Sequence, residues 1–263
     1  MTGLGWGLLI GWVSSLFVFG CAGWFAYKRY ERLQKHARES ERLAELGTLT
    51  GGLAHEIKNP LSTVQLNLQL LGEDLDPANP AYPRLSSRLK TVQKETARLR
   101  DTVDDFLRYA GRMELVKQPV DLNNLLEELV DFFSPQAQLQ RVQLRLRRAD
   151  GNLVAPVDER LLKQAILNLL INGLQAMPEA GGEIILSARR QDGRALLEVI
   201  DTGRGMDADT VKRIFDAYYS TKRSGTGLGL AIARRVIREH GGEIKVRSEP
   251  GKGSAFEMWI PMA

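Results

Sequence analysis

The chain has 263 residues, of which 43% are apolar and 26% charged, and its formal net charge is +4. This composition indicates folded cores over most of the chain, in one large domain or two small ones with an appendage. The single cysteine, Cys21, excludes an internal disulfide and argues against a cysteine-based metal cluster.

The amino-terminal segment is apolar from Leu4 to Tyr27, since the first charged side chain is that of Lys28. As a helix it would be about 36 Å long, which is enough to cross a bilayer with some tilt. Basic residues follow at once, and by the positive-inside rule they keep the rest of the chain in the cytoplasm. We therefore expect a single-pass transmembrane anchor at 1–27 and a juxtamembrane linker helix at 28–43.

Two other interpretations of the same segment have less support. A cleaved signal peptide would begin with a charged region, which is missing here. Gly20-Cys21 faintly resembles a lipoprotein cleavage site, but processing there would place the remainder of the chain outside the cell. The basic run after the anchor accounts for much of the net charge, and it favours anionic membrane lipid over nucleic acid as a partner.

Two long helical patterns follow, and a segment with three prolines at 76–83 predicts the turn between them. In both patterns apolar residues recur at steps of three and four, which marks one face of a helix. A second copy usually completes such a face, so we predict a homodimeric four-helix bundle at 44–116. The alternative is a monomeric hairpin packed on the C-terminal domain. The positions are Leu46, Leu49, Leu53, Ile57, Leu61, Val64, Leu68, Leu71 and Leu75, then Leu85, Leu89, Val92, Thr96, Leu99, Val103, Phe106, Ala110 and Met113.

The remainder, 117–263, mixes helical and strand patterns. Asp121 and Asp158 are suitable caps for helices that reach about Gln140 and Met177. Gln191-Asp192-Gly193 predicts a hairpin turn between two strands, and Gly241-Gly242 ends a further helix. We expect an α+β protein whose C-terminal domain is an α/β sandwich. The expected strands are 142–146, 152–157, 183–190, 194–200, 243–248 and 254–260, and the last helix is 228–239.

Several residues of this domain suit a nucleotide. Asp201 ends an apolar strand, where a buried carboxylate needs a partner such as a ligand amine. The Gly225–Leu230 segment precedes a helix, whose free amides and dipole can hold phosphate oxygens. A dinucleotide fold would instead place a strand directly before the glycine turn. Here about 20 residues, 206–224, intervene, and that length matches a lid that closes over ATP.

Asn168 and Asn172 lie four residues apart and therefore share one helix face. A carboxamide oxygen can bind Mg²⁺ when triphosphate oxygens and waters complete its coordination. His55 lies about 200° around the first helix from the apolar stripe, so we expect its side chain to point into solvent, as a nucleophile must. His36 and His240 are interpreted as surface histidines without a role.

Four motifs occur in order: His55-Glu56-Ile57-Lys58-Asn59-Pro60, Asn168-Leu169-Leu170-Ile171-Asn172, Asp201-Thr202-Gly203-Arg204-Gly205-Met206 and Gly225-Thr226-Gly227-Leu228-Gly229-Leu230. Together they resemble the H, N, G1 and G2 boxes of the sensor histidine kinases of two-component systems, over residues 43–261. The resemblance implies a HisKA-type dimerisation and phosphoacceptor hairpin and a GHKL-type ATP-binding domain with the Bergerat fold at 117–263.

The resemblance also implies roles for single residues. Glu56 would orient and deprotonate His55, which attacks the γ-phosphorus, and Asn59 would orient a water that dephosphorylates the partner. Asp201 would accept a hydrogen bond from the adenine amino group, with Gly203 and Gly205 allowing close approach of the backbone. Asn172 would bind the metal, supported by Asn168. Further nucleotide contacts are expected from Phe215, Gly225, Gly227, Leu228 and Gly229.

Lys222 is our candidate for the cation that neutralises phosphate charge in the transfer. Two positions depart from the usual family pattern. Gln175 stands where a basic residue often follows the second asparagine by three, so one phosphate contact is in question. Ala217 replaces a proline that often lies two residues after Phe215.

The resemblance implies an enzyme of the bacterial inner membrane with its kinase domains in the cytoplasm. It would be a protein-histidine kinase that uses ATP and Mg²⁺ to autophosphorylate His55. It would pass the phosphoryl group to an aspartate in the receiver domain of a response regulator, and phosphatase activity toward that partner is also open. The alternative is a GHKL-type ATP-binding conformational or scaffold protein without histidine kinase activity, but those proteins lack an H-box hairpin.

Overall fold

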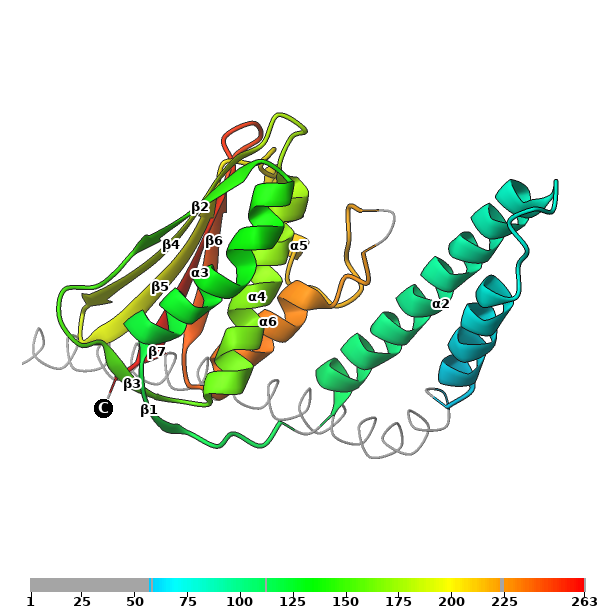
Figure 1. Ribbon diagram of the computed structural model, residues 1–263. Coiled ribbons are helices and arrows are strands. Elements are labelled where there is room, and N and C mark those ends of the chain that lie inside the picture. Colours follow the sequence, from blue (N-terminus) through cyan, green and yellow to red (C-terminus); the bar gives the residue numbers. More distant parts are fainter. Residues whose placement is uncertain (1–56, 58, 112, 223–224, 263) are drawn as a thin grey trace, which may run out of the picture. The chain divides into compact units, whose positions relative to one another are not determined.

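The computed structural model describes residues 57, 59–111, 113–222 and 225–262 (Figure 1). The predicted anchor and linker at 1–43 lie outside the described residues, and so do His55 and Glu56. In the part of the chain that is described, no helix has both the length and the apolar character needed to cross a membrane.

The first described element is a helical hairpin. Residue 57 and residues 59–73 are helical, and the second helix is α2, Tyr82–Ala110. The turn between them is built by Asp76 and Asn79, whose side chains accept hydrogen bonds from the amides two residues later at 2.8 and 2.9 Å. Gln93 Nε2 of α2 donates to the Leu68 carbonyl at 3.1 Å, so the two helices lie side by side.

The apolar face of the hairpin divides into two sets that alternate along each helix. One set is half-buried or buried between the two helices of the hairpin: Leu61, Leu68, Leu75, Leu89, Thr96 and Val103. The other set, spaced by seven residues, is 39–56% exposed: Ile57, Val64, Leu71, Leu85, Val92 and Leu99. A heptad seam with only one of its two positions covered is typical of a helix that packs against one more partner.

The C-terminal domain contains two sheets and four helices within the described residues. Strands β1 (Gln118–Asp121) and β3 (Val154–Val157) form a small antiparallel pair. A five-stranded sheet has the order β2-β4-β5-β7-β6, in which only the β2·β4 pair is parallel. Its strands are β2 Val142–Arg147, β4 Gly182–Gln191, β5 Arg194–Asp201, β6 Glu243–Ser248 and β7 Ser254–Pro261. The helices are α3 Leu122–Leu139, α4 Glu159–Ala176, α5 Ala208–Arg213 and α6 Gly229–Glu239.

Local sequence signals explain where these elements begin and turn. Asp121 caps α3 by accepting from the Asn123 amide, and Asp158 caps α4 by accepting from the Leu161 amide. Asp192 and Gly193 both have positive φ, +51° and +70°, which is the two-residue turn favoured between antiparallel strands. The predicted caps and the predicted β4–β5 hairpin are therefore confirmed.

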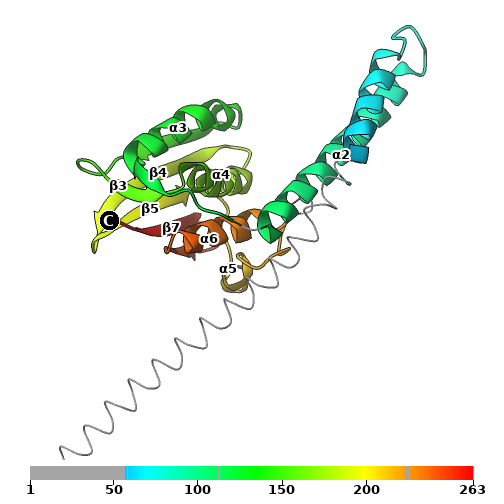
Figure 2. The same cartoon turned by 90° about the horizontal axis from the view of Figure 1, so that it is seen from below.

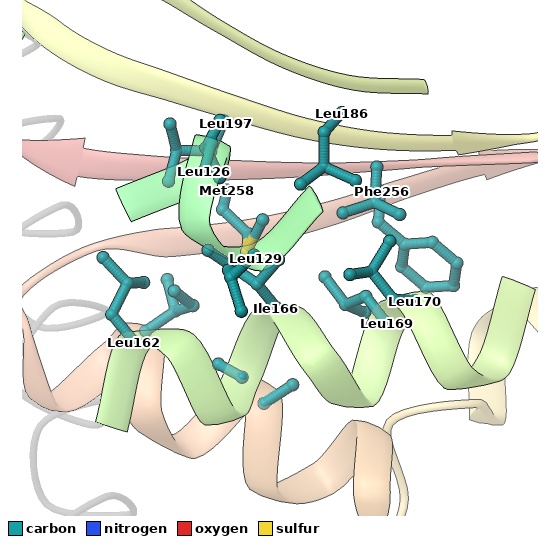
Figure 3. Packing of buried hydrophobic residues seen from close by; sticks show 14 of the residues in the cluster. Leu126, Leu129, Leu162, Ile166, Leu169, Leu170, Leu186, Leu197, Phe256 and Met258 are labelled. Atoms are coloured by element: carbon teal, nitrogen blue, oxygen red, sulfur yellow. The ribbon is translucent and has the colours of Figure 1, made fainter. Parts of the chain in front are cut away.

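Helices α3, α4 and α6 cover one face of the five-stranded sheet (Figures 1 and 2). The core lies between these two layers, where leucine and isoleucine side chains of α3 and α4 meet Leu186 of β4, Leu197 of β5, and Phe256 and Met258 of β7 (Figure 3). Side chains 1% exposed or less come from both layers, among them Phe133, Leu162, Ile166, Leu186 and Phe256. This layered core fixes the carboxyl end of β5 beside α4, which positions the candidate site.

The strand and helix boundaries of the C-terminal domain agree with the predicted ones to within about two residues, whereas α2 ends at Ala110, three residues before the predicted seam position Met113. Two elements were not predicted. Strand β1 contains Pro119 and has few apolar residues, so its sequence gave little strand signal. The segment 206–222, expected only as a lid, contains the short helix α5, capped by Asp207.

His240 is not a surface histidine, so that interpretation was wrong: its residue is 3% exposed. Its Nε2 accepts a hydrogen bond from the Asp158 amide at 2.9 Å, and its Nδ1 lies 2.8 Å from the Val236 carbonyl oxygen. The imidazole is therefore neutral with the proton on Nδ1. Burial lowers the pKa of His240 from its usual value, and the positive charge of Lys117 lowers it further. The ring joins the end of α6 to the start of α4.

Candidate active site

Asp201 is the last residue of β5 and is 3% exposed. Its Oδ1 accepts a hydrogen bond from the Gly203 amide at 2.9 Å, and Ser254 of β7 lies opposite Asp201 in the strand register. Burial raises the pKa of Asp201, although the polar groups of Gly203 and Ser254 act in the opposite direction. The Cβ of Asp201 lies against Gly173 of α4, where an added Cβ would be 3.4 Å away.

The glycine turn that precedes α6 meets the asparagine face of α4. Asn168 Nδ2 donates to the Gly229 carbonyl at 3.0 Å, so the predicted N and G2 boxes are in direct contact. The N-cap residue of α6, Leu228, is fully buried and makes no side-chain cap. The first-turn amides of α6 thus have no side-chain cap, and such a helix start is suited to an anion.

Lys222 is held at the same end of α4. Its Nζ donates to Asn172 Oδ1 at 2.8 Å and to Gln175 Oε1 at 2.9 Å. Burial lowers the pKa of Lys222 to about 8, helped by the positive charge of Arg204, whereas Asp201 acts to raise it. Two residues predicted separately, Asn172 as metal ligand and Lys222 as phosphate cation, are therefore in direct contact.

Two glycines of the motifs allow main chains to approach closely. Gly205 has φ +64°, and a Cβ there would be 1.9 Å from the Glu249 carbonyl oxygen. Gly227 has φ +70°, and a Cβ there would be 2.5 Å from the Tyr218 carbonyl carbon. The Tyr218 amide donates to the Gly227 carbonyl at 3.1 Å, which ties the lid segment to the G2 turn. A side chain at either position would push these turns apart.

The remaining predicted residues lie at different distances from this cluster. The Gly225 amide donates to the Lys222 carbonyl at 3.4 Å, close to the site. Phe215 is half-buried and packs edge-on against Phe256, with ring centroids 6.3 Å apart, so it anchors the lid segment to the core. Asn59 lies on the first helix of the hairpin and is exposed.

Sequence reasoning missed two residues of the site. Ser254 lowers the pKa of Asp201, because β7 pairs with β5 in a register that places the two residues opposite each other. Ser254 lies 53 residues after Asp201, and no local sequence pattern predicts that the two residues meet. Gln175 was noted only as a departure from the family pattern, whereas the structure gives it a contact with Lys222. The signal that could have found it is its spacing of three from Asn172, which places both on one helix face.

Comparison with known proteins identifies two families along the chain. Residues 45–112 match the His Kinase A (phospho-acceptor) domain. Residues 157–263 match the family described as Histidine kinase-, DNA gyrase B-, and HSP90-like ATPase. The order, hairpin first and ATPase second, agrees with the order of the four sequence motifs.

Named relatives agree with this assignment. The sensor histidine kinase ZraS of Escherichia coli (strain K12) is 34% identical over 254 residues, which are 95% of this chain and 54% of ZraS. The chain thus spans about half the length of the curated relatives it matches.

Two solved structures are also similar. Full-length ShkA in complex with AMPPNP has a TM-score of 0.70 and 31% identity, covering 81% of this chain and 45% of ShkA. The histidine kinase ThkA in complex with the response regulator protein TrrA has a TM-score of 0.61 and 26% identity, covering 85% of this chain and 64% of that one. The two matched domains, their order and the relatives together show that the chain belongs to the sensor histidine kinases of two-component systems.

Proposed function

We propose that the protein is an ATP-dependent histidine kinase that phosphorylates its own His55 and passes the phosphoryl group to an aspartate of a response regulator. One observation carries the proposal: residues from α4, the end of β5, the lid segment and the start of α6 converge at one end of α4, as a nucleotide site requires. They belong to an ATPase domain that follows a phosphoacceptor hairpin.

Asp201 recognises the adenine amino group in this proposal. Its carboxylate is buried and already accepts from the Gly203 amide, yet burial still raises its pKa. A further donor, such as an exocyclic amine, would offset part of the cost of keeping the charge in a buried place. The uncapped first turn of α6 and Lys222 would bind the phosphates.

The residues present fit a magnesium ion bound together with ATP. Asn172 Oδ1 already faces a cation, because it accepts from the Lys222 ammonium. A neutral carboxamide oxygen is a reasonable Mg²⁺ ligand when phosphate oxygens and waters supply the other positions. The ion would neutralise charge on the transferred phosphoryl group, while Asn168 holds α4 against the start of α6.

In the transfer, one imidazole nitrogen of His55 forms a bond to the γ-phosphorus, and the bond from that phosphorus to the β–γ bridging oxygen breaks. Glu56, next to His55, accepts the proton from the other ring nitrogen. Asn59, four residues after His55 and exposed, would orient the water that attacks the aspartyl phosphate of the response regulator, so that the bond from phosphorus to the carboxylate oxygen breaks and inorganic phosphate leaves.

A second copy of the chain completes the hairpin. The support is the exposed heptad set on both helices, since a dimeric four-helix bundle would cover it. We propose the divisions 44–116 for the hairpin and 117–263 for the ATP-binding domain, following a membrane anchor at 1–27 and a linker at 28–43. The basic linker would contact anionic lipid of the bacterial inner membrane.

A receiver domain is the proposed phosphoryl acceptor, supported by the similarity to ThkA, whose solved complex contains a response regulator.

Autophosphorylation with [γ-³²P]ATP tests the proposal. His55→Gln is expected to abolish acid-labile labelling, because the nucleophile is gone, while His36→Gln retains it. Asp201→Asn is expected to reduce nucleotide affinity by about a hundredfold, since one of the two acceptor oxygens is replaced by an NH2 donor that cannot accept from the adenine amine. Labelling of His55→Gln at the wild-type level would exclude the assignment of the phosphoacceptor.

A further inference from the structure

Lys222 and Gln175 form a contact that has no role in the proposed catalytic cycle. Lys222 Nζ lies between two carboxamide oxygens of α4, 2.8 Å from Asn172 Oδ1 and 2.9 Å from Gln175 Oε1. The two acceptors are three residues apart, so they face the same side of the helix. The ammonium group is thus held by two neutral oxygens, one of which belongs to the proposed metal ligand.

An ammonium and a magnesium ion cannot both occupy this place. Mg²⁺ requires ligand distances of about 2.1 Å in a nearly ideal octahedron, so an ammonium that shares the Asn172 oxygen would lie within about 4 Å of the ion. Two cations so close repel each other strongly in a partly buried site. Mg²⁺ binding at Asn172 therefore requires the lysine to leave that oxygen.

The charges around Lys222 make the Gln175 oxygen important. Lys222 is half-buried, and the nearby Arg204 repels its charge. Asp201 is the acidic group that acts on it favourably. A basic side chain at position 175 would add a second repulsion, whereas the glutamine oxygen accepts a hydrogen bond without adding charge.

We infer that Gln175 is a positioning residue: it holds the Lys222 ammonium on the Asn172 oxygen, so that Mg²⁺·nucleotide must displace this lysine in order to bind. The inference rests on the proposed function. Because residue 175 is a glutamine and not a basic residue, Lys222 and the metal ion compete for the Asn172 oxygen.

Removing the glutamine acceptor should make displacement easier. Gln175→Met keeps the length and helix preference of the side chain but leaves Lys222 with a single acceptor. A hydrogen bond to a charged group in a partly exposed place corresponds to about a three- to tenfold change in a binding constant. Mg²⁺·AMPPNP should therefore bind three- to tenfold more tightly to Gln175→Met, and a lower Mg²⁺ concentration should give half-saturation at fixed AMPPNP.

The test is a double-mutant cycle measured by calorimetry on the full chain. It compares wild type, Gln175→Met, Lys222→Met and the double variant, with Mg²⁺·AMPPNP as the probe. If Gln175 acts through Lys222, Gln175→Met tightens binding in the wild-type background and changes nothing in the Lys222→Met background. Gln136→Met, an exposed glutamine on α3, is the matched control and should bind as wild type does.

Two outcomes would overturn the inference. Weaker binding of Gln175→Met in both backgrounds would mean that Gln175 touches the nucleotide directly, and unchanged binding in both would mean that its contact with Lys222 has no effect on metal binding. A wild-type protein without measurable affinity for Mg²⁺·AMPPNP would instead overturn the proposed function itself.

Discussion

The hairpin and the C-terminal domain bury their apolar side chains in different ways. Among the described residues from 57 to 109, Thr96 is the single buried side chain, at 6% exposure. In the C-terminal domain, Phe133, Leu162 and Phe256 are 1% exposed or less, because three helices close over one face of the sheet. The domain therefore completes its own core, whereas half of the hairpin's heptad seam is exposed among the described residues.

This difference concerns where folding free energy comes from. A domain with a closed core gains it within one chain, so its stability does not depend on protein concentration. A hairpin with an uncovered seam gains it on association, and its stability then rises with the concentration of the second copy. Substitutions in the two regions should consequently affect different measurements.

The largest effect is expected on the exposed heptad set. Leu71→Glu places two unpaired carboxylates in the predicted dimer interface, and such burial costs about 3–5 kcal/mol per charge. The dimer should dissociate more than about a hundredfold more readily, as seen in the mass from light scattering.

Leu66→Glu is the matched control for this substitution. Leu66 is 57% exposed and Leu71 56%, in the same helix, but Leu66 lies off the seam. The Leu66→Glu protein should remain dimeric. Equal dissociation of both variants would show that the seam is not the interface.

The second prediction concerns the closed core. Phe133 is 1% exposed and its neighbour Phe132 is 73% exposed on the same helix, α3. Phe133→Ala should lower the free energy of unfolding of the C-terminal domain by about 3–5 kcal/mol, since it leaves a cavity. Phe132→Ala should change it by less than about 0.5 kcal/mol. Denaturant unfolding measures both, and the mass of the dimer should stay that of the wild type.

A smaller effect, the pH dependence of the free energy of unfolding, should be specific to the C-terminal domain, because His240 lies there. The pKa of His240 is lowered in the folded protein by burial, so the unfolded chain takes up a proton first as the pH falls. The neutral ring makes its full contribution to the free energy of unfolding above about pH 6.5. This contribution is lost as the pH falls from there through the folded-state pKa, and the free energy changes by at most about 1.4 kcal/mol per pH unit.

His240→Gln should remove this slope from the unfolding of the C-terminal domain. Asp158, which contacts the ring through its amide, titrates in a separate window. Burial acts to raise the pKa of the Asp158 carboxyl, but the hydrogen bonds from the Leu161 and Val116 amides outweigh burial and lower it. The stability that the Asp158 carboxylate contributes is therefore lost only below about pH 3.8. Identical pH profiles for wild type and His240→Gln between pH 4 and 6.5 would contradict this account of the ring.

Local signals in the sequence were sufficient for most of the elements. The Asp121 and Asp158 caps, the Asp192-Gly193 turn and the heptad steps each act over a few residues, and the structure has the elements they predicted. Strand β1 and helix α5 were missed because neither has a strong pattern of its own: β1 is formed by pairing with β3, which lies more than 30 residues away.

The sequence by itself determined the family motifs, their order and the residue types available for binding a nucleotide, since these depend on composition and short spacings. Only the tertiary structure decided which of them meet. Asn172 and Lys222 are 50 residues apart, and Asp158 and His240 are 82 apart. Contacts over such separations depend on how the helices pack on the sheet and on strand register, which no local pattern encodes.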